Sequence, residues 1–315
     1  MNETNSIINR VYAIEKIIGR GSFGVVYKGH HIKTLDCVAI KTEHVDNKMK
    51  ILKHEAYILN HLYRNGCRCI SPIYYYGLCS QHLCLVMNFF HKTLEDYMKE
   101  HLVYDVSAVQ ENRKLLHKVM TKMLDIIENI HCRDIVHRDL KPPNFMLDSH
   151  NNIYLIDFGM ATTFLSSATG KHIDGSLPLY CEREFLLGNP CYMSYNLYEG
   201  YEPVRRDDLI SIGYMYLYFI NGSLPWTIIP HENNGPSTYP LLHVKHWKNQ
   251  YYKQQKSWDS LYKLFIQYDD PIVDYMRYCY RLGFDTIPNY QGLKHLFLAD
   301  EGGGSSFSSS SSSYT

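Results

Sequence analysis

The stretch His137-Arg138-Asp139-Leu140-Lys141-Pro142-Pro143-Asn144 decides the fold of this chain, together with three other motifs. Two of them precede it: the glycine-rich run Gly19-Arg20-Gly21-Ser22-Phe23-Gly24-Val25-Val26, and Val38-Ala39-Ile40-Lys41. The third, Asp157-Phe158-Gly159, follows it. A glycine-rich run by itself is a weak signal, because ordinary hairpin turns also contain glycine. Four motifs in a fixed order rarely assemble by chance and are therefore specific.

Length and charge exclude several classes of protein. The chain has 315 residues, of which 32 are basic and 32 acidic, so its formal net charge is +0. This length builds one large or two small domains with a substantial core. A neutral chain has no global field directed toward nucleic acid or an anionic membrane, so we expect neither as a partner.

Targeting signals and cysteine content predict an intracellular protein, in the cytoplasm or the nucleus. Residues 1–10 lack the apolar core of a signal peptide, and the longest apolar run, 209–220, is too short to span a bilayer. The nine cysteines contain no Cys-x-x-Cys pair. We expect them to be reduced thiols, with zinc binding as the minor alternative.

Hydrophobic periodicity divides the chain into a strand-rich part and a helical part. Period-two alternation predicts strands, whereas apolar residues at helical spacing predict helices. The predicted strands are 11–18, 25–30, 37–42, 72–76, 83–87 and 153–156. The predicted helices are 50–62, 107–131 with an N-cap at Ser107, 206–221, 258–267 and 271–282.

These elements predict an α+β fold with two lobes. A small N-terminal antiparallel sheet with one helix is expected in residues 1–90, and a larger, mainly helical lobe in residues 91–299. Residues 300–315 are rich in glycine and serine. Because such residues bury almost no apolar area, we expect them to form a disordered tail.

The glycine-rich run suits a ligand with concentrated negative charge. Gly19, Gly21 and Gly24 lack side chains, so backbone N–H groups around Ser22 could approach phosphate oxygens. An ordinary hairpin turn is the alternative for these glycines taken alone.

Lys41 lies among apolar residues on a predicted buried strand, where an ammonium group is costly unless it is paired. Glu55 is the expected partner, because the helix register turns it toward the sheet. Glu43, on the same strand face as Lys41, is the alternative. The pair would direct the ammonium at the α- and β-phosphates of ATP. We expect Glu55 to lie near the surface, where it could hydrate if Lys41 were replaced.

The later motifs supply the groups that phosphoryl transfer needs. Asp139 would orient a hydroxyl group and accept its proton, and Lys141 would neutralise charge on the moving phosphoryl group. Asn144 and Asp157 offer the hard oxygen ligands that Mg²⁺ prefers. The alternative is a polar surface loop, but the ordered motifs favour the catalytic interpretation.

Two further charged residues lie close to these motifs. Arg138 would either bind a phosphate on the segment after Gly159 or have a structural role. Asp208 precedes an apolar helix and is predicted to be a buried carboxylate. It would accept hydrogen bonds from the backbone of the catalytic loop, residues 137–144.

The ordered motifs match the protein-kinase signature, and motifs further along the chain are similar to those of the casein kinase 1 family. The latter include Ser194-Tyr195-Asn196, Arg205-Arg206-Asp207-Asp208-Leu209, Gly213-Tyr214, Gly222-Ser223-Leu224-Pro225-Trp226 and Pro288-Asn289-Tyr290. The resemblance covers about residues 11–297. It implies a bilobal, non-specific serine/threonine protein kinase that uses ATP and Mg²⁺ to phosphorylate protein substrates. We also expect a monomer.

The resemblance implies an adenine pocket as well. Met87 would lie beside adenine, and the backbone groups of Phe90 would pair with the base. The residues that would wall the pocket are Ile18, Val26, Ala39 and Leu147. A plain core role is the alternative for each of them.

Several positions depart from the family pattern. Cys191 and Pro230 stand where the resemblance implies an arginine and a lysine that bind acidic or phosphorylated residues upstream of the target. We therefore expect weak selectivity for such substrates. Asn189 replaces a threonine that links the catalytic aspartate to the catalytic lysine. A catalytically weak pseudokinase, acting as an ATP-binding scaffold, is the alternative function.

Residues 227–270 diverge most from the family. The lysines of this stretch form either a docking surface or, in our interpretation, a solvated helix face. They are Lys245, Lys248, Lys253 and Lys256. Nucleic-acid binding by these lysines is a second alternative, against which the neutral net charge argues.

Overall fold

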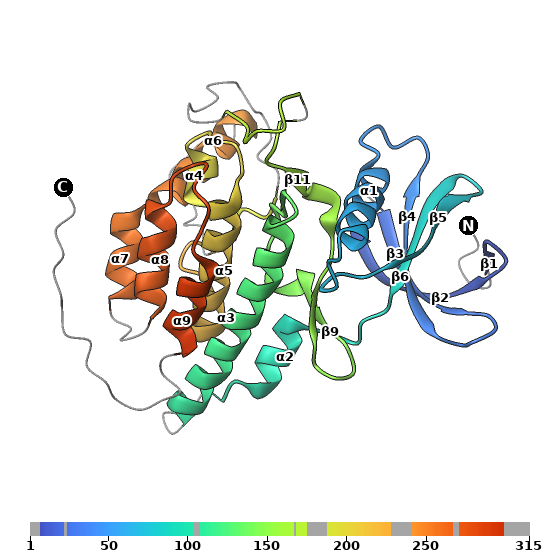
Figure 1. The fold of residues 1–315 in the computed structure, drawn as a ribbon, viewed down its shortest axis with the longest axis horizontal. Coiled ribbons are helices and arrows are strands. Elements are labelled where there is room, and N and C mark those ends of the chain that lie inside the picture. The colour runs from blue at the N-terminus through green and yellow to red at the C-terminus, as the bar shows by residue number, and fades with distance from the viewer. Residues whose placement is uncertain are drawn as a thin grey trace.

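The computed structural model describes residues 7–21, 24–103, 108–166, 168–174, 188–227, 241–266 and 271–298, and of residues 241–247 it describes the backbone. The chain folds into a sheet-based lobe and a helical lobe (Figure 1), which confirms the predicted α+β, bilobal fold class. The predictions for Ser22, Ser107, Pro230 and the tail at 300–315 lie outside the described residues.

A sheet forms the N-terminal lobe. Within the described residues it has six antiparallel strands in the order β1-β2-β3-β4-β6-β5. These strands are β1 (Ile7–Ile8), β2 (Tyr12–Gly21), β3 (Gly24–His31), β4 (Cys37–His44), β5 (Ile73–Cys79) and β6 (His82–Asn88). Because β4 pairs with β3 on one side and β6 on the other, Lys41 stands on an internal strand, as its apolar neighbours predicted.

Helix α1 (Ile51–Arg64) packs on one side of this sheet (Figure 1), with its apolar residues turned inward. Glu43 on β4 satisfies the N-terminus of the helix, since its carboxylate accepts hydrogen bonds from the N–H groups of Ile51 (3.1 Å) and Leu52 (3.3 Å). Glu43 is therefore engaged by α1, and the alternative that it pairs with Lys41 is wrong.

The helical lobe is arranged around α3 and α5 (Figure 1). Its helices are α2 (Leu94–His101), α3 (Val109–His131), α4 (Tyr195–Tyr198), α5 (Arg205–Asn221), α6 (Leu241–Gln255), α7 (Trp258–Phe265), α8 (Ile272–Arg281) and α9 (Tyr290–Leu298). Helix α5 is buried along most of its length, as an all-round apolar sequence predicts. For helix α6 the sequence predicts only a solvated helix face and no bounds, because its lysine, glutamine and tyrosine residues form no apolar stripe.

Short strands frame the segments between the lobes. The small sheets are β10-β9-β7 and β11-β8. Their strands are β7 (Lys92–Thr93), β8 (Ile135–Val136), β9 (Phe145–Leu147), β10 (Ile153–Leu155) and β11 (Thr162–Thr163). Two turns of 3₁₀ helix, Pro142–Asn144 and Phe158–Met160, stand beside them. The catalytic loop thus lies between β8 and β9, and Asp157 comes two residues after β10.

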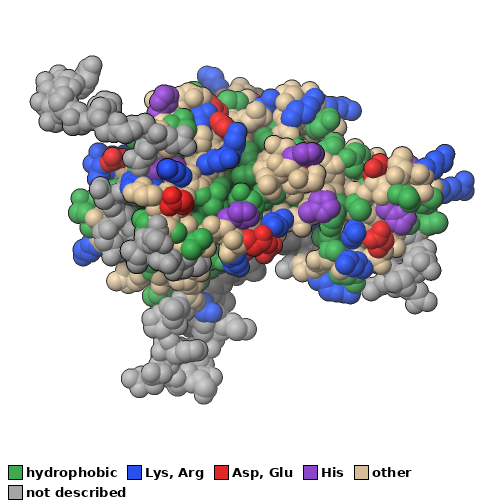
Figure 2. Space-filling view, turned by 90° about the horizontal axis from the view of Figure 1, so that it is seen from below, with side chains coloured by type: hydrophobic (Ala, Val, Ile, Leu, Met, Phe, Trp, Pro, Cys, Tyr) green, Lys and Arg blue, Asp and Glu red, His purple; other side chains and the backbone are tan. Residues whose placement is uncertain are grey.

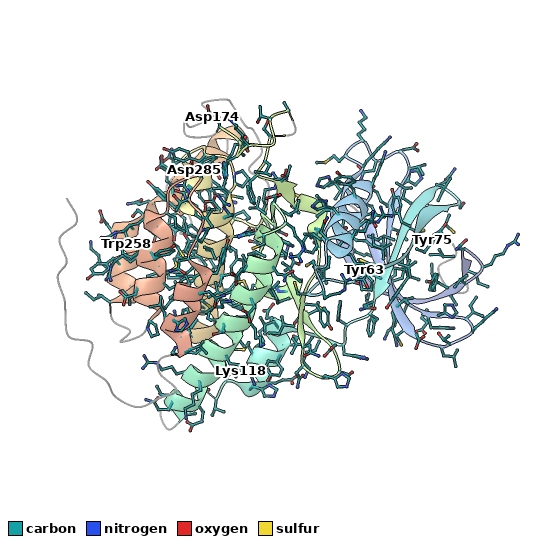
Figure 3. The ribbon with its side chains drawn as sticks, viewed as in Figure 1. Tyr63, Tyr75, Lys118, Asp174, Trp258 and Asp285 are labelled. Atoms are coloured by element: carbon teal, nitrogen blue, oxygen red, sulfur yellow. The ribbon has the colours of Figure 1, made fainter. Side chains whose placement is uncertain are left out.

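Apolar packing joins the lobes. Leu52 and Leu59 on α1 belong to the same buried cluster as the apolar residues of α3 and α5, whereas Ile40 and Val86 lie in a separate cluster of the sheet. On the face in Figure 2, Lys and Arg side chains are spread over both lobes among acidic and histidine side chains. In Figure 3, Tyr75 on β5 and Trp258 on α7 mark opposite ends of the molecule. None of the helices in the described ranges has the length and apolarity that crossing a membrane requires.

Candidate active site

Lys41 is the centre of an ion-pair network that joins β4, α1 and the segment after β10. Its Nζ atom lies 2.7 Å from Glu55 Oε2 and 2.7 Å from Asp157 Oδ1. The predicted pairing with Glu55 is confirmed. The Glu55 side chain is only 1 % exposed, however, so the expectation that it lies near the surface is wrong. Glu55 lies on the buried face of α1, together with apolar residues such as Leu52 and Leu59.

The network favours the charged forms of Lys41 and Asp157. Burial opposes the charge on Lys41, but the carboxylates of Glu55 and Asp157 outweigh this effect and raise the pKa of the ammonium. Burial likewise opposes ionisation of Asp157, but the charge of Lys41 prevails and lowers the pKa of that carboxyl. Burial raises the pKa of Glu55, although the charge of Lys41 opposes this effect. At neutral pH the site therefore holds the Lys41 ammonium beside the Asp157 carboxylate.

The glycines of the hairpin between β2 and β3 differ in how much space surrounds them. A Cβ atom on Gly24 would lie 1.9 Å from the carbonyl oxygen of Thr42 on β4, so the close approach of two strands requires this glycine. A Cβ atom on Gly21 would meet no described atom within 4 Å. One on Gly19 would make ordinary contact with Val26 at 3.7 Å. Packing thus explains Gly24, while the space beside Gly21 is open to a ligand.

Several residues predicted to surround adenine lie on neighbouring strands of the sheet. Val26 on β3 pairs with Lys41 on β4, and Ala39 on β4 pairs with Met87 on β6. Ile18 on β2 is 45 % exposed, which a core role does not explain. The sheet therefore sets Val26, Ala39 and Met87 close to the ammonium that would hold phosphates.

Two other predicted pocket residues are more deeply buried. Leu147 on β9 is 2 % exposed and belongs to the main apolar cluster, and such burial fits both a core role and the wall of a closed pocket. Phe90, which follows β6, is 7 % exposed, and its ring centroid lies 4.9 Å from that of Tyr154. The contact with Tyr154 fixes the side chain of Phe90 against β10.

A second charged centre lies in the catalytic loop. Lys141 Nζ donates to Asp139 Oδ2 at 2.6 Å, and the amide nitrogen of Asn144 donates to the backbone oxygen of Asp139 at 2.9 Å. The backbone N–H of Asn189 donates to Asp139 Oδ1 at 2.9 Å. Both oxygens of the proposed catalytic carboxylate are thereby oriented by neighbours, one of which belongs to a segment 50 residues away in the sequence.

Asp208, at the start of α5, forms hydrogen bonds with the backbone of the catalytic loop. Its carboxylate accepts hydrogen bonds from the backbone N–H groups of His137 (2.7 Å) and Arg138 (3.0 Å), which confirms the predicted role. The same carboxylate lies 3.0 Å from His131 Nε2, and His131 Nδ1 lies 2.6 Å from the hydroxyl of Tyr290. His131 and Tyr290 were not predicted. The available signal was a histidine on the apolar face of α3.

Arg138 and Asn189 make contacts that the sequence left open. Arg138 has a left-handed backbone (φ 69°), and its Nε donates to the carbonyl oxygen of Met160 on the segment after Gly159. This contact favours the alternative that Arg138 has a structural role. The side chain of Asn189 accepts from the N–H of Cys191 at 2.9 Å, so it shapes its own turn and does not bridge Asp139 to Lys141.

The residues predicted to bind Mg²⁺ fit a hard cation. The side-chain amide nitrogen of Asn144 donates hydrogen bonds to Asp139. Among the described residues, no group donates to Asn144 Oδ1 or Asp157 Oδ2. The Asp157 side chain is 40 % exposed. One neutral and one charged oxygen therefore remain for a metal that prefers oxygen ligands.

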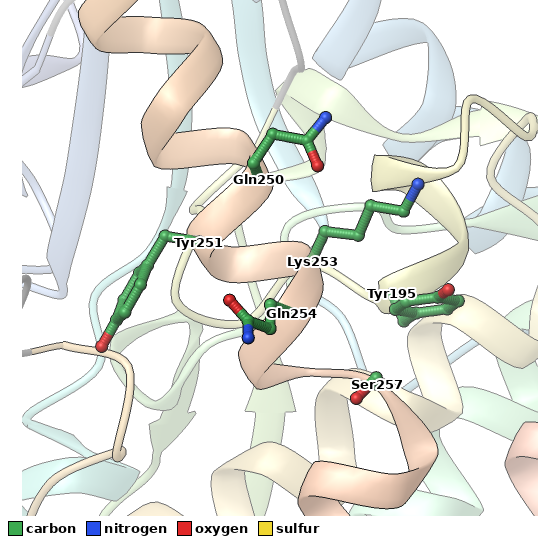
Figure 4. Close-up of a pocket in the computed structure, with 6 residues that line it drawn as sticks. All are labelled: Tyr195, Gln250, Tyr251, Lys253, Gln254 and Ser257. Carbon is green, nitrogen blue, oxygen red and sulfur yellow. The ribbon is translucent and has the colours of Figure 1, made fainter.

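A separate hollow of about 440 Å³ lies between α4 and α6 (Figure 4). The residues that line it are Tyr195, Gln250, Tyr251, Lys253, Gln254 and Ser257. None of these residues belongs to the two charged centres described above.

Comparison with known proteins agrees with this geometry. Residues 12–280 match the family described as "Protein kinase domain". The chain is 32 % identical over 302 residues to casein kinase I homolog 2 of Schizosaccharomyces pombe, and 32 % identical over 302 residues to casein kinase I homolog 1 of Saccharomyces cerevisiae. Each alignment covers 94 % of this chain, but 64 % and 52 % of the two relatives.

The chain thus spans between half and two thirds of the length of these curated relatives. The match to the domain family covers most of the chain, and it includes every element that holds Lys41, Asp139 and Asp157. The chain belongs to the protein kinase family, among its casein kinase I-like members.

Proposed function

We propose that this protein is a serine/threonine protein kinase that transfers the γ-phosphate of Mg-ATP to protein hydroxyl groups. The observation that supports the proposal most is the presence of two complete charged centres in one molecule. Lys41 stands between Glu55 and Asp157 in the first. In the second, Asp139 accepts a hydrogen bond from Lys141.

In the proposed reaction the substrate hydroxyl oxygen bonds to the γ-phosphorus, the bond from that phosphorus to the bridging oxygen breaks, and ADP leaves. Asp139 accepts the hydroxyl proton. Lys141, 2.6 Å from Asp139, neutralises charge on the transferred group. Lys41 holds the α- and β-phosphates. Asn144 and Asp157 would hold Mg²⁺, which would offset the phosphate charge.

The remaining assignments complete this proposal. Residues 1–90 form the lobe that binds ATP, and residues 91–299 form the lobe that binds the protein substrate and provides the catalytic loop. The adenine pocket is bounded by residues of β2, β3, β4, β6 and β9 and by one residue that follows β6. These residues are Ile18, Val26, Ala39, Met87, Phe90 and Leu147. We propose a monomer with no nucleic-acid or membrane partner, in line with the scattered charges of Figure 2.

A pseudokinase is the alternative. Its support is Asn189, which replaces the expected threonine and whose side chain does not reach Asp139 or Lys141. The direct contact of Lys141 with Asp139 argues against it, because the catalytic pair is held without such a bridge.

The test uses the purified chain with radiolabelled ATP, Mg²⁺ and a generic acceptor protein. We expect label on serine and threonine of the acceptor, and we expect Asp139→Asn or chelation of Mg²⁺ to abolish it. Binding of ATP without transfer would establish the pseudokinase. A shift of labelled DNA or RNA in a gel at physiological salt would contradict the absence of a nucleic-acid partner.

A further inference from the structure

Lys256, just after α6, is the most unusual lysine in the described part of the chain. It was predicted to lie on a solvated helix face with its neighbours, but its side chain is 0 % exposed. The prediction is correct for Lys248, which is exposed. Lys253 lines the hollow of Figure 4 and pairs with Glu199 at 3.0 Å. The chain turns at the end of α6, and this turn directs Lys256 inward.

Four aromatic rings enclose the Lys256 ammonium. Its Nζ atom lies 5.1 to 5.3 Å from the ring centroids of Tyr198, Tyr214, Trp226 and Tyr252. Such distances allow the faces of the rings to attract a cation. Among the described residues no carboxylate forms an ion pair with Lys256, and burial lowers the pKa of this lysine well below its ordinary value.

The side-chain hydrogen bonds of Lys256 go to one short loop, residues 190–193. Its Nζ atom donates to the backbone oxygens of Pro190 (2.6 Å) and Met193 (2.7 Å). The carbonyl groups between these two are held as well. Trp226 Nε1 donates to the oxygen of Cys191 at 2.8 Å, and Ser211 Oγ donates to the oxygen of Tyr192 at 2.7 Å.

Each carbonyl of this loop is therefore held by a side chain from elsewhere in the helical lobe. The residue before the loop, Asn189, donates its backbone N–H to Asp139. The side chain of Asn189 then accepts from the N–H of Cys191, inside the loop. A continuous series of hydrogen bonds thus runs from Lys256 through the loop to the proposed catalytic carboxylate.

We propose that Lys256 is a positioning residue, which anchors loop 190–193 so that a protein substrate is presented to Asp139 in the correct geometry. The inference rests on the proposed function, since the loop adjoins Asp139. It explains why a lysine stands at this place. A buried ammonium without a carboxylate costs stability, and an apolar residue of similar length would fill the aromatic enclosure without that cost.

This reasoning predicts an unusual result for Lys256→Met. The variant loses two hydrogen bonds but also loses a buried unpaired charge, so we expect its Tm to change by no more than about 3 °C. We expect kcat/KM for a peptide substrate to fall about 10- to 100-fold, because small displacements of a bound substrate cost that much. The KM for ATP and the slow hydrolysis of ATP without peptide should stay unchanged.

Lys248→Met is the matched control, since it makes the same substitution on α6 at an exposed position. Trp226→Phe is a second test, because it keeps an aromatic ring beside Lys256 and removes the donor to Cys191. It should lower peptide kcat/KM in the same direction, and it keeps the proposal testable if Lys256→Met fails to fold.

Hydrogen exchange supplies a readout that does not depend on activity. We expect the amides of residues 188–194 to exchange faster in Lys256→Met than in the wild type, with those of α3 and α5 unchanged. Equal exchange and equal peptide kinetics would overturn the proposal. So would a parallel loss of Tm, ATP binding and peptide turnover, which a purely structural lysine predicts. An inactive wild type would refute the proposed function, and loop exchange would still decide whether Lys256 anchors the loop.

Discussion

Lys41 is partly buried and Lys256 is fully buried, and opposite surroundings compensate their charges. Lys41 lies between two carboxylates, which raise its pKa, whereas Lys256 has carbonyl oxygens and ring faces, and burial lowers its pKa. The first arrangement stabilises the ion, which in the proposed function holds phosphate groups. The second costs stability and fixes a loop. At the residue scale, partners decide what a buried lysine does.

For Lys41→Met we expect loss of both phosphoryl transfer and stability. The change leaves Glu55, whose side chain is 1 % exposed, without its cation. Removing one partner of a buried pair costs about 3 kcal/mol, because an uncompensated charge stays buried. Thermal unfolding and a transfer assay measure the two effects. The double variant Lys41→Met/Glu55→Gln should recover stability but not activity, and a single variant as stable as the wild type would contradict this account.

Asp139→Asn should abolish transfer and spare the fold. The amide can still accept from Asn189 N–H, but it cannot accept a proton, and loss of a positioned base lowers kcat by about 10²- to 10⁴-fold. Binding of ATP, followed by titration of a fluorescent analogue, should stay unchanged. Near wild-type turnover would remove Asp139 from the mechanism.

At the scale of the element, the hairpin of β2 and β3 offers two glycines with different functions. Gly24→Ala places a Cβ atom 1.9 Å from the backbone oxygen of Thr42, which cannot move without distorting β4. We expect a loss of about 1–3 kcal/mol of stability. The Cβ atom of Gly21→Ala meets no described atom within 4 Å, so the stability of this variant should change by less than about 0.5 kcal/mol while its ATP affinity falls.

Denaturant unfolding and the KM for ATP separate the two glycine variants. Gly24→Ala should lower the unfolding midpoint, and Gly21→Ala should raise the KM alone. The reverse pattern would mean that Gly24 is the glycine that approaches the ligand.

Selectivity for phosphorylated substrates depends on how side chains from distant segments are arranged, because a substrate phosphate must meet cationic side chains that have no other partner. Cys191 provides none. Arg205 donates to the backbone oxygen of Asp285 and stacks over an aromatic ring, and Arg206 donates to the backbone oxygen of Leu282.

We therefore expect matched peptides with and without a phosphoserine three residues upstream of the target to differ by no more than about fivefold in kcat/KM, equivalent to about 1 kcal/mol. Steady-state kinetics on the two peptides measures the ratio. A larger preference for the phosphorylated peptide would show that other lysines or arginines supply the charge.

The sequence by itself determined the fold class, the family and the catalytic motifs, because these depend on local patterns. Apolar spacing predicted α1 with Glu55 on its inner face, and an apolar run predicted α5. Where no apolar stripe exists, as in α6, periodicity predicted nothing. The order of the motifs indicated that Lys41, Asp139 and Asp157 work together, without showing which atoms meet.

Only the tertiary structure decided the partners of these residues, because each contact joins segments far apart in the sequence. Asp157 binds Lys41 across 116 residues, and Asp208 binds the N–H of His137 across 71. Burial is decided in the same way. Lys248 and Lys256 differ by eight positions in one stretch, but one is exposed and the other is enclosed by rings from three other segments. A charged residue's environment is set by what packs against it, and local pattern does not contain that information.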